Sequence, residues 1–377
     1  MKTHLTKFIL SIIMSAWAIS SSTAQYRILE DARATSLVQA GMDSIYNLNF
    51  TAADSIIELL ENKLGDYPGN LLLKAFYTTW KYKPLIDGHD SYHQFESYLT
   101  EAIALCEEIL EENEDDEAAN FFLMASHAFL AELYVNNGHN LKALSEAKSA
   151  YKYIKIGFDQ LDNNPEFYFS SGIYNYYREK YPEENPFYKP FLWFFRSGDK
   201  QEGINMLKKG AEKATFTRAE CLTYLFHIYL RYEDDPSSAL TYATLLKDKY
   251  PNNLHYTANY VENCVRLNRY ENLMPYIQQL IDGEDDFYIY LGEIFLGYLL
   301  EKDKNDLKNA LIHYNRADKI GEEKECRILH YDSILFLGLG RIFQKQNKEE
   351  LATAFLKKSV KSAEYQSYRK DAEALLD

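Results

Sequence analysis

Residues 336–359 read FLGLGRIFQKQNKEELATAFLKKS, and the spacing of their small and apolar side chains decides the fold. Residues three or four apart share one face of a helix, and the apolar positions on both sides of Asn347 follow that spacing. The stretch therefore predicts two helices joined by a turn at Asn347. The positions that carry the pattern are Leu339, Gly340, Phe343, Ala352, Leu356 and Ser359.

The same offsets recur in four other segments of the chain. In residues 239–253, Ala239, Ala243 and Leu246 are followed by Pro251, twelve positions after the first alanine. The other copies are carried by Leu296, Gly297, Ala310, Tyr314 and Ala317; by Tyr134, Gly138, Ala143, Ala147 and Ala150; and by Gly41, Phe50, Ala53, Tyr67 and Pro68. This pattern resembles the tetratricopeptide repeat, a pair of antiparallel helices of about 34 residues.

The resemblance implies an all-α fold, a right-handed superhelical solenoid of about eight TPR-like hairpins with a C-terminal capping helix. Small residues on the second helix of each hairpin would let it lie close against the first. Because one hairpin cannot bury its own apolar face, the copies are expected to stack into a single domain over residues 25–377. The capping helix is expected from Ser367 to Leu376. The hairpins are expected near residues 29–66, 69–112, 116–160, 165–214, 217–249, 253–282, 286–320 and 325–363.

Two of these hairpins carry an insertion between their helices, near residues 84–91 and 181–198. The second contains the stretch PFYKPFLWFF at residues 186–195, which we call the aromatic insertion. An exposed apolar surface of this kind marks a docking site for a partner or a membrane interface. The alternative is that the stretch folds back on its own scaffold as a small satellite core. Its candidate partner-binding residues are Phe187, Tyr188, Phe191, Trp193 and Phe194.

The residues that follow, FRSGDK at 195–200, resemble a motif of the tetratricopeptide family linked to inclusion clearance at the mitochondrial outer membrane, which has exported bacterial relatives. Arg196 stands where that motif has a small residue, and Lys200 where it has an arginine. The resemblance implies a shared architecture and no enzymatic activity. From its position, Asp199 is expected to cap the next helix.

The N-terminal residues have the pattern of a secretory signal. Lys2 and Lys7 precede the apolar stretch 8–19, and the small residues 22–24 form a cleavage site, so we interpret residues 1–24 as a signal peptide. We expect an exported protein, periplasmic or secreted, without a lipoprotein cysteine at the cleavage site. No comparable apolar run follows, so no transmembrane segment is expected.

The charge of the mature chain argues against polyanionic partners. Without Lys2 and Lys7 it has 39 basic residues against 56 acidic ones, hence a net charge of −17. Nucleic acid is disfavoured because its binding requires a basic surface, and an anionic membrane is disfavoured for the same reason.

No pattern of catalytic or cofactor-binding residues is present in the sequence. Nucleophile motifs and glycine-rich phosphate loops are absent, so we expect no cofactor and no enzyme. His89 and His93 would share a face of a helix and could hold zinc, but a polar loop that caps the next helix explains them better. Four cysteines permit disulfides in an oxidising compartment, or they are small buried packing residues; their pairing stays open. These are Cys106, Cys221, Cys264 and Cys326, each of which is expected to lie in a helix.

The leading hypothesis is a non-catalytic scaffold that binds a protein or peptide in the concave groove of the solenoid, through the aromatic insertion, or both. First helices line that groove in tetratricopeptide proteins. The groove residues predicted on this basis are Tyr224, His227, Asn259, Asn263 and Arg266. The alternative is a carbohydrate-binding protein similar to the starch-binding outer-membrane proteins built on such hairpins; an aromatic ring flanked by Asp, Asn and Arg would favour it. An enzyme of unrecognised type is the third hypothesis.

Overall fold

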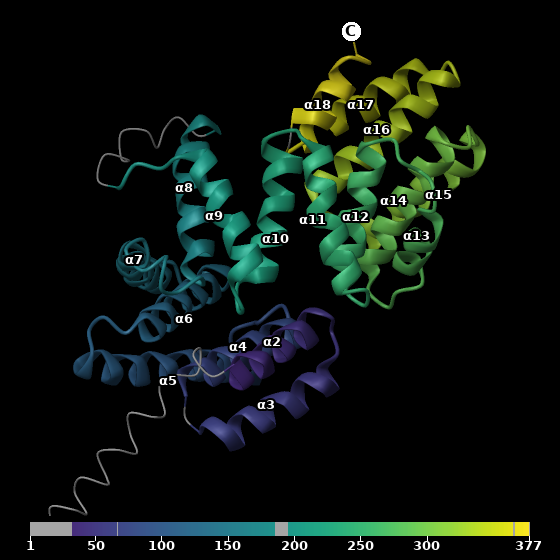
Figure 1. Cartoon of the computed structure of the whole chain (residues 1–377). Coiled ribbons are helices and arrows are strands. Elements are labelled where there is room, and N and C mark those ends of the chain that lie inside the picture. The colour runs from purple at the N-terminus through teal and green to yellow at the C-terminus, as the bar shows by residue number, and fades with distance from the viewer. Residues whose placement is uncertain (1–31, 66, 185–194, 365, 377) are drawn as a thin grey trace, which may run out of the picture. The chain divides into compact units, whose positions relative to one another are not determined.

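The computed structural model of the chain describes residues 32–65, 67–184, 195–364 and 366–376. Over these residues all regular secondary structure is helical (Figure 1). The chain divides into two compact units, Met1–Cys221 and Leu222–Asp377, which we call unit 1 and unit 2.

Unit 1 contains four helical hairpins, in each of which consecutive helices pack against each other. The residues after the fourth begin α10 (Arg218–His227), which continues into unit 2. The helices of the four hairpins are α2 (Ala32–Tyr46) with α3 (Phe50–Leu64), α4 (Pro68–Tyr82) with α5 (Asp90–Glu112), α6 (Glu117–Asn136) with α7 (Asn140–Gly157), and α8 (Phe167–Glu184) with α9 (Lys200–Lys213).

Unit 2 continues the series and ends with a short helix. The π-helical turn η2 (Ile228–Tyr232) completes the first helix of the fifth hairpin, whose second helix is α11 (Pro236–Lys249). The remaining hairpins are α12 (Leu254–Arg266) with α13 (Met274–Ile281), α14 (Asp286–Lys302) with α15 (Leu307–Glu323), and α16 (Leu329–Lys345) with α17 (Glu349–Ser362), followed by α18 (Gln366–Glu373). The first helices α12, α14 and α16 pack side by side, and α18 packs on α17 and α16 (Figure 1).

The turn inside most hairpins is built in the same way. One residue adopts a left-handed backbone conformation, and the next N–H closes a hydrogen bond to a carbonyl five residues earlier, as Lys348 does to Phe343 at 3.0 Å, or six residues earlier, as Asp235 and Asp306 do. The first of these is the hydrogen-bond pattern of a Schellman helix end. The left-handed residues are Leu48, Gly138, Asp234, Asn268, Asn305 and Asn347, with φ between 50° and 78°. The turn predicted at Asn347 is confirmed.

Small residues bring the two helices of a hairpin together, as the sequence predicted. The side chains of Ala239, Ala243 and Ala310 are 0% exposed, and Ala352 is 2% exposed. The closest approach lies between α8 and α9, where a Cβ atom added at Gly203 would lie 2.7 Å from the carbonyl oxygen of Gly172. Only glycine permits backbones to come this close.

The all-α fold class, a helical-repeat solenoid with a final helix, is therefore confirmed for the described residues. Three helix boundaries differ from those predicted in ways that bear on the insertions or on the capping helix, which ends at Glu373 and not at Leu376. Helix α5 begins at Asp90, ahead of the histidine pair's second member, and α8 continues to Glu184 with Pro182 inside its last turn. A proline in the final turn removes only one helical hydrogen bond, so the helix can run past it.

One described helix, α6, is long and apolar enough by length and composition to cross a membrane. Most of its apolar stretch is buried inside unit 1, and the core helix of a globular protein has the same composition. Its neighbours α5 and α7 pack against it.

Candidate functional site

The site that the structure builds most completely is a polar layer between the first helices of unit 2. We call it the inner face of unit 2, and it comprises His227, Arg231, His255, Asn259, Glu262, Arg266, His330 and Tyr331. Glu262 on α12 lies at its centre with 1% of its surface exposed. Its carboxylate is 2.6 Å from Nε2 of His330, accepts a hydrogen bond from Tyr331 at 3.4 Å, and lies 3.7 Å from Arg231.

Electrostatics fix Glu262 in its charged form. Burial alone would raise the pKa of its carboxyl, but the charge and hydrogen bond of His330, together with Arg231, outweigh burial and lower the pKa to about 2. Because His330 lies on α16, two hairpins after α12, this pair also shows that the layer of first helices curves inward. The charged groups of Glu262, His330 and Arg231 therefore lie together within this layer.

The structure places four of the five predicted groove residues in or beside this layer. Asn259 and Asn263 are 0% exposed; their amide groups lie 3.3 Å from Nε2 of His255 and 3.0 Å from the carbonyl of Pro236. Within the described part of the chain, their Oδ1 atoms and Nδ1 of His227 are buried without a hydrogen-bond partner.

His227 is held neutral by its surroundings. Burial, and then the positive charge of Arg231 and the neighbouring histidines, lowers the pKa of His227 well below its usual value. The fifth predicted residue, Tyr224, is half-buried on α10.

Arg266 connects the inner face to the C-terminal helix. Its guanidinium lies 3.1 Å from the carboxylate of Asp371 on α18 and 3.7 Å from that of Asp234 in the turn before α11. It also lies over the ring of Tyr368, 5.3 Å from the centroid. The ring of Tyr368 also packs against the ring of His330, with centroids 5.7 Å apart. The chain's own α18 therefore contacts two residues of the inner face.

Three further buried carboxylates lie on the first helices of unit 2, and sequence reasoning had not singled them out. Glu293 is paired with His313 and Arg316, Glu301 binds Arg341 through two hydrogen bonds of 2.7 and 2.8 Å, and Asp332 accepts from Tyr290 and Arg327. The signal was present in the sequence: each acid interrupts an otherwise apolar helix. A buried acid costs much energy unless it is paired, so removing the partner of any of these acids would destabilise the stack.

The aromatic insertion is the second candidate surface. Its five predicted partner-binding residues, Phe187, Tyr188, Phe191, Trp193 and Phe194, lie outside the described residues. Its last residue, Phe195, packs edge-on against Tyr151 at 5.3 Å, although 44% of it is exposed. Arg196 lies over the ring of Phe158 at 4.2 Å and accepts a hydrogen bond from Tyr174 at its carbonyl. The described end of the insertion is thus fixed on α7 and α8.

The turn after the insertion has the predicted cap. Asp199 Oδ1 accepts a 2.8 Å hydrogen bond from the N–H of Glu202, which confirms Asp199 as the N-cap of α9. The insertion of the second hairpin folds onto the turn of the third. There Asn137 accepts from the N–H of Asp87 and donates to the carbonyl of Leu85.

Exposed apolar side chains gather at the turn ends of hairpins two to four in unit 1. Leu141 is 86% exposed and Leu144 69%, and they share one face of α7. The others at these ends are Tyr82, Ile86, Val135, Tyr181 and Phe195, each between 44% and 54% exposed. Apolar surface of this kind is typical of an interaction site.

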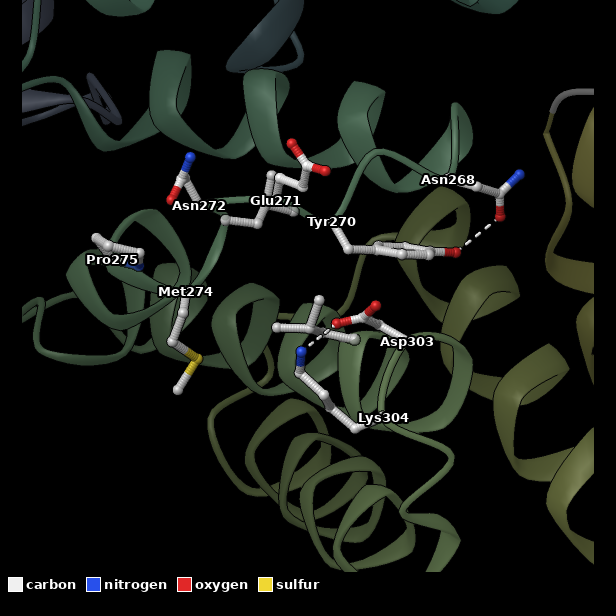
Figure 2. A pocket seen from close by; sticks show the side chains of 10 residues that line it. Asn268, Tyr270, Glu271, Asn272, Met274, Pro275, Asp303 and Lys304 are labelled. Carbon is white, nitrogen blue, oxygen red and sulfur yellow. Dashed lines mark hydrogen bonds and ion pairs between the residues drawn. The ribbon is translucent and has the colours of Figure 1, made fainter.

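A pocket of about 530 Å³ lies at the turn ends of unit 2, between the α12–α13 and α14–α15 turns (Figure 2). The ring of Tyr270 extends across it, and its hydroxyl donates to Asn268 at 2.7 Å. Asp303 and Lys304 form an ion pair of 2.6 Å on the facing turn. The remaining lining residues are Glu271, Asn272, Leu273, Met274, Pro275 and Leu299.

No group of three or more His, Cys, Asp or Glu side chains in the described part of the chain is arranged to hold a metal ion. His89 is the residue before α5 and His93 lies in its first turn, so the two do not form a ligand pair on one helix. The four cysteines are unpaired. Cys106, Cys221 and Cys264 are buried in helices, whereas Cys326 lies half-buried in the loop before α16 and not in a helix.

Comparison with known proteins gives little beyond this geometry. No family model and no curated protein matches the chain. Among solved structures, the crystal structure of yeast Tom70 is similar over 82% of this chain and 63% of that chain, with 16% sequence identity and a TM-score of 0.38. This chain thus spans less than two thirds of the length of that Tom70 chain. The fold assignment rests on the hairpins of the chain itself.

Proposed function

We propose that the protein is an exported, non-catalytic tetratricopeptide-type scaffold that binds a segment of a protein or peptide partner. The observation that carries the proposal is that the inner face of unit 2 already binds a helix, the chain's own α18. Arg266 supplies a charge and His330 a ring for that contact. Helix-in-groove binding of this type is a common mode of peptide recognition.

The electrostatics of the inner face support binding over catalysis. Glu262 is held ionised by His330 and Arg231, and His227 is held neutral by burial, so neither is poised to exchange protons near neutral pH. The aromatic insertion and the exposed apolar turn ends of unit 1 supply a second surface for the same partner or another one. Export is proposed from the signal-like residues 1–24, which lie outside the described residues.

A crosslinking pull-down from the native envelope fraction tests this function. The mature protein is compared with a variant that carries Phe191, Trp193 and Phe194 changed to serine, and with Arg266→Asp on the inner face. Circular dichroism first establishes that all three are folded. A defined protein retained by the wild type and lost by at least one variant supports the scaffold. If neither variant changes the proteins retained, neither surface binds a partner.

Carbohydrate binding is the second candidate function, and the pocket around Tyr270 favours it. An aromatic ring flanked by Asn268, Asn272 and Asp303 combines a stacking surface with amide and carboxylate groups suited to sugar hydroxyls. Isothermal titration with soluble glucans and with envelope glycans, for the wild type and Tyr270→Ala, separates the two functions. Binding that Tyr270→Ala abolishes would establish a glycan site.

A further inference from the structure

We propose that α18 occupies a docking site for a partner helix and can be displaced from it by one with the same pattern of anchors. The inference rests on the proposed function, because it names the kind of segment that the inner face receives. The occupant we assign is an amphipathic helix of a partner protein that carries an aromatic residue and, three positions later, an acid.

The contacts of α18 define this pattern. Tyr368 is 4% exposed and Ala372 0%, and Leu375 and Leu376 pack partly buried on the core of unit 2. These positions are spaced i, i+4, i+7 and i+8; Tyr368 and Ala372 share one face of α18, and Leu375 and Leu376 lie in the turn that follows it. Anchors at such spacing are typical of a helix bound in a groove. Asp371, at i+3, adds the ion pair with Arg266 at 3.1 Å.

The contacts that hold α18 in place are defined by particular anchor residues, but they contribute little to the stability of the docked helix. Helix α18 has eight residues, too few for a stable helix in isolation, so its order depends on docking. The Arg266–Asp371 pair is partly exposed, with 23% and 49% of the side-chain surfaces accessible. Exposed pairs of this kind contribute little to stability.

One contact is actively unfavourable. Among the residues that the structure describes, the buried hydroxyl of Tyr368 has no hydrogen-bond partner. A buried unpaired hydroxyl loses its hydration and gains nothing in return. A partner helix with phenylalanine at this position, or one that pairs the hydroxyl, would therefore bind the same surface better than α18 does.

The short connection between α17 and α18 sets how strong a competitor must be. Residues 363–365 join the two helices, so α18 is present at its site at an effective concentration on the order of millimolar. An identical segment added in trans competes poorly with it. Substitutions that weaken the anchor contacts of α18 offset its high effective concentration. The docking site is then accessible to a peptide added in trans.

The test uses the full mature chain and a fluorescent synthetic peptide of residues 365–377. A released variant, Tyr368→Ala with Asp371→Asn, is expected to bind the peptide, as a rise in fluorescence anisotropy; asparagine removes the charge without creating a partner for an acid at position 266. The wild type is expected to show no rise at the same concentrations. Adding Arg266→Asp to the released variant should weaken binding at least about fivefold, and a peptide with Asp371→Arg should recover it. A peptide that carries both released-variant substitutions is the control and should not bind.

The variant Asp371→Asn covers the case in which the released variant does not fold, because it keeps Tyr368 in place. It is expected to bind the peptide more weakly than the released variant and more strongly than the wild type. The proposal is overturned if no folded variant binds the peptide, or if binding does not depend on Arg266. It is also overturned if the released variant forms a dimer by exchange of α18 between copies and binds no peptide when diluted to monomer.

Failure of this inference and failure of the proposed function are distinguishable. Peptide binding without any captured envelope partner would leave the docking site standing and remove the scaffold function. A partner captured through the aromatic insertion, without peptide binding at Arg266, would do the reverse.

Discussion

Glu262 on α12 and His330 on α16 lie two hairpins apart in chain order and are joined by a 2.6 Å contact between Oε1 and Nε2. The pair is 1% and 4% exposed at the side chains, and Tyr331 and Arg231 complete its surroundings. It connects non-adjacent first helices, so it fixes the curvature of the inner face. The first prediction follows from its charge.

Glu262→Gln should lower the free energy of unfolding of unit 2 at neutral pH. It should also make that free energy less dependent on pH in the acid range. The pKa of Glu262 falls from 4.5 to about 2 on folding, so its stabilisation is complete above the unfolded pKa and is lost as pH falls through the folded one. The size is about 3 kcal/mol at neutral pH. Denaturant titrations between pH 7 and about pH 2, followed by far-UV circular dichroism, measure it.

Tryptophan fluorescence provides the control for this experiment. The tryptophans of the mature chain, Trp80 and Trp193, both precede residue 222, so fluorescence reports on unit 1. In the Glu262→Gln variant, the midpoint of the denaturation curve should shift when it is followed by circular dichroism and should stay unchanged when it is followed by fluorescence. Equal pH dependence in the wild type and the variant would contradict the assignment of the charge.

Glu166→Ala should destabilise unit 1. The buried Glu166 carboxylate accepts hydrogen bonds from the N–H groups of Thr215, Phe216 and Thr217, at 2.6 to 3.1 Å, and from the Thr217 hydroxyl. Removing it leaves these donors buried and unpaired, at a cost of about 3 kcal/mol. Denaturation followed by tryptophan fluorescence measures the loss. A change below about 0.5 kcal/mol would show that water replaces the carboxylate.

Gly203→Ala should destabilise the α8–α9 hairpin by about 2 kcal/mol, because its Cβ would meet the backbone of Gly172 and Tyr176 at 2.7 Å. Gly41→Ala is the matched control in the same unit. There the new Cβ meets only the side-chain atoms of Leu73 and Ile56, at 3.2 and 3.3 Å, and the gain in helix propensity offsets the contact. An equal loss of stability in the two variants would mean that the backbones of α8 and α9 lie farther apart at Gly203 than the structure shows. Both variants are measured by thermal denaturation.

The four thiols should react slowly in the folded protein. Burial raises the pKa of Cys106, Cys221, Cys264 and Cys326, so little reactive thiolate is present at neutral pH. A thiol-specific chromogenic reagent should label Cys326 first, because it alone is only half-buried, and all four after denaturation. Fast labelling of Cys106 or Cys221 in the native protein would contradict their burial.

The repeat could be predicted from the sequence because its signals are local. Ala239, Ala310 and Ala352 mark second helices by spacing alone, and Asn347 marks a turn whose left-handed backbone suits asparagine. The same local reasoning predicted the cap at Asp199. It could not predict that Cys326 lies in a loop, because a cysteine has no strong helix preference.

The inner face could be predicted only in part. Helix α12 was expected to supply Asn259, Asn263 and Arg266, but their partners lie elsewhere in the chain. Arg266 meets Asp371 across 105 positions, and Glu262 meets His330 across 68. Such pairings depend on how the hairpins stack, which no local pattern encodes. The same holds for the acids paired with Arg341 and Arg327.

Site-specific photo-crosslinking in the native envelope fraction tests the scaffold most directly. A photoreactive residue is placed at His255 on the inner face, at Trp193 in the aromatic insertion, and at Lys319 on α15, whose side chain is 70% exposed, as the control. We predict an adduct with a defined protein from position 255 or 193 and none from position 319. The same adducts from all three positions, or none from any, would contradict a partner-binding scaffold.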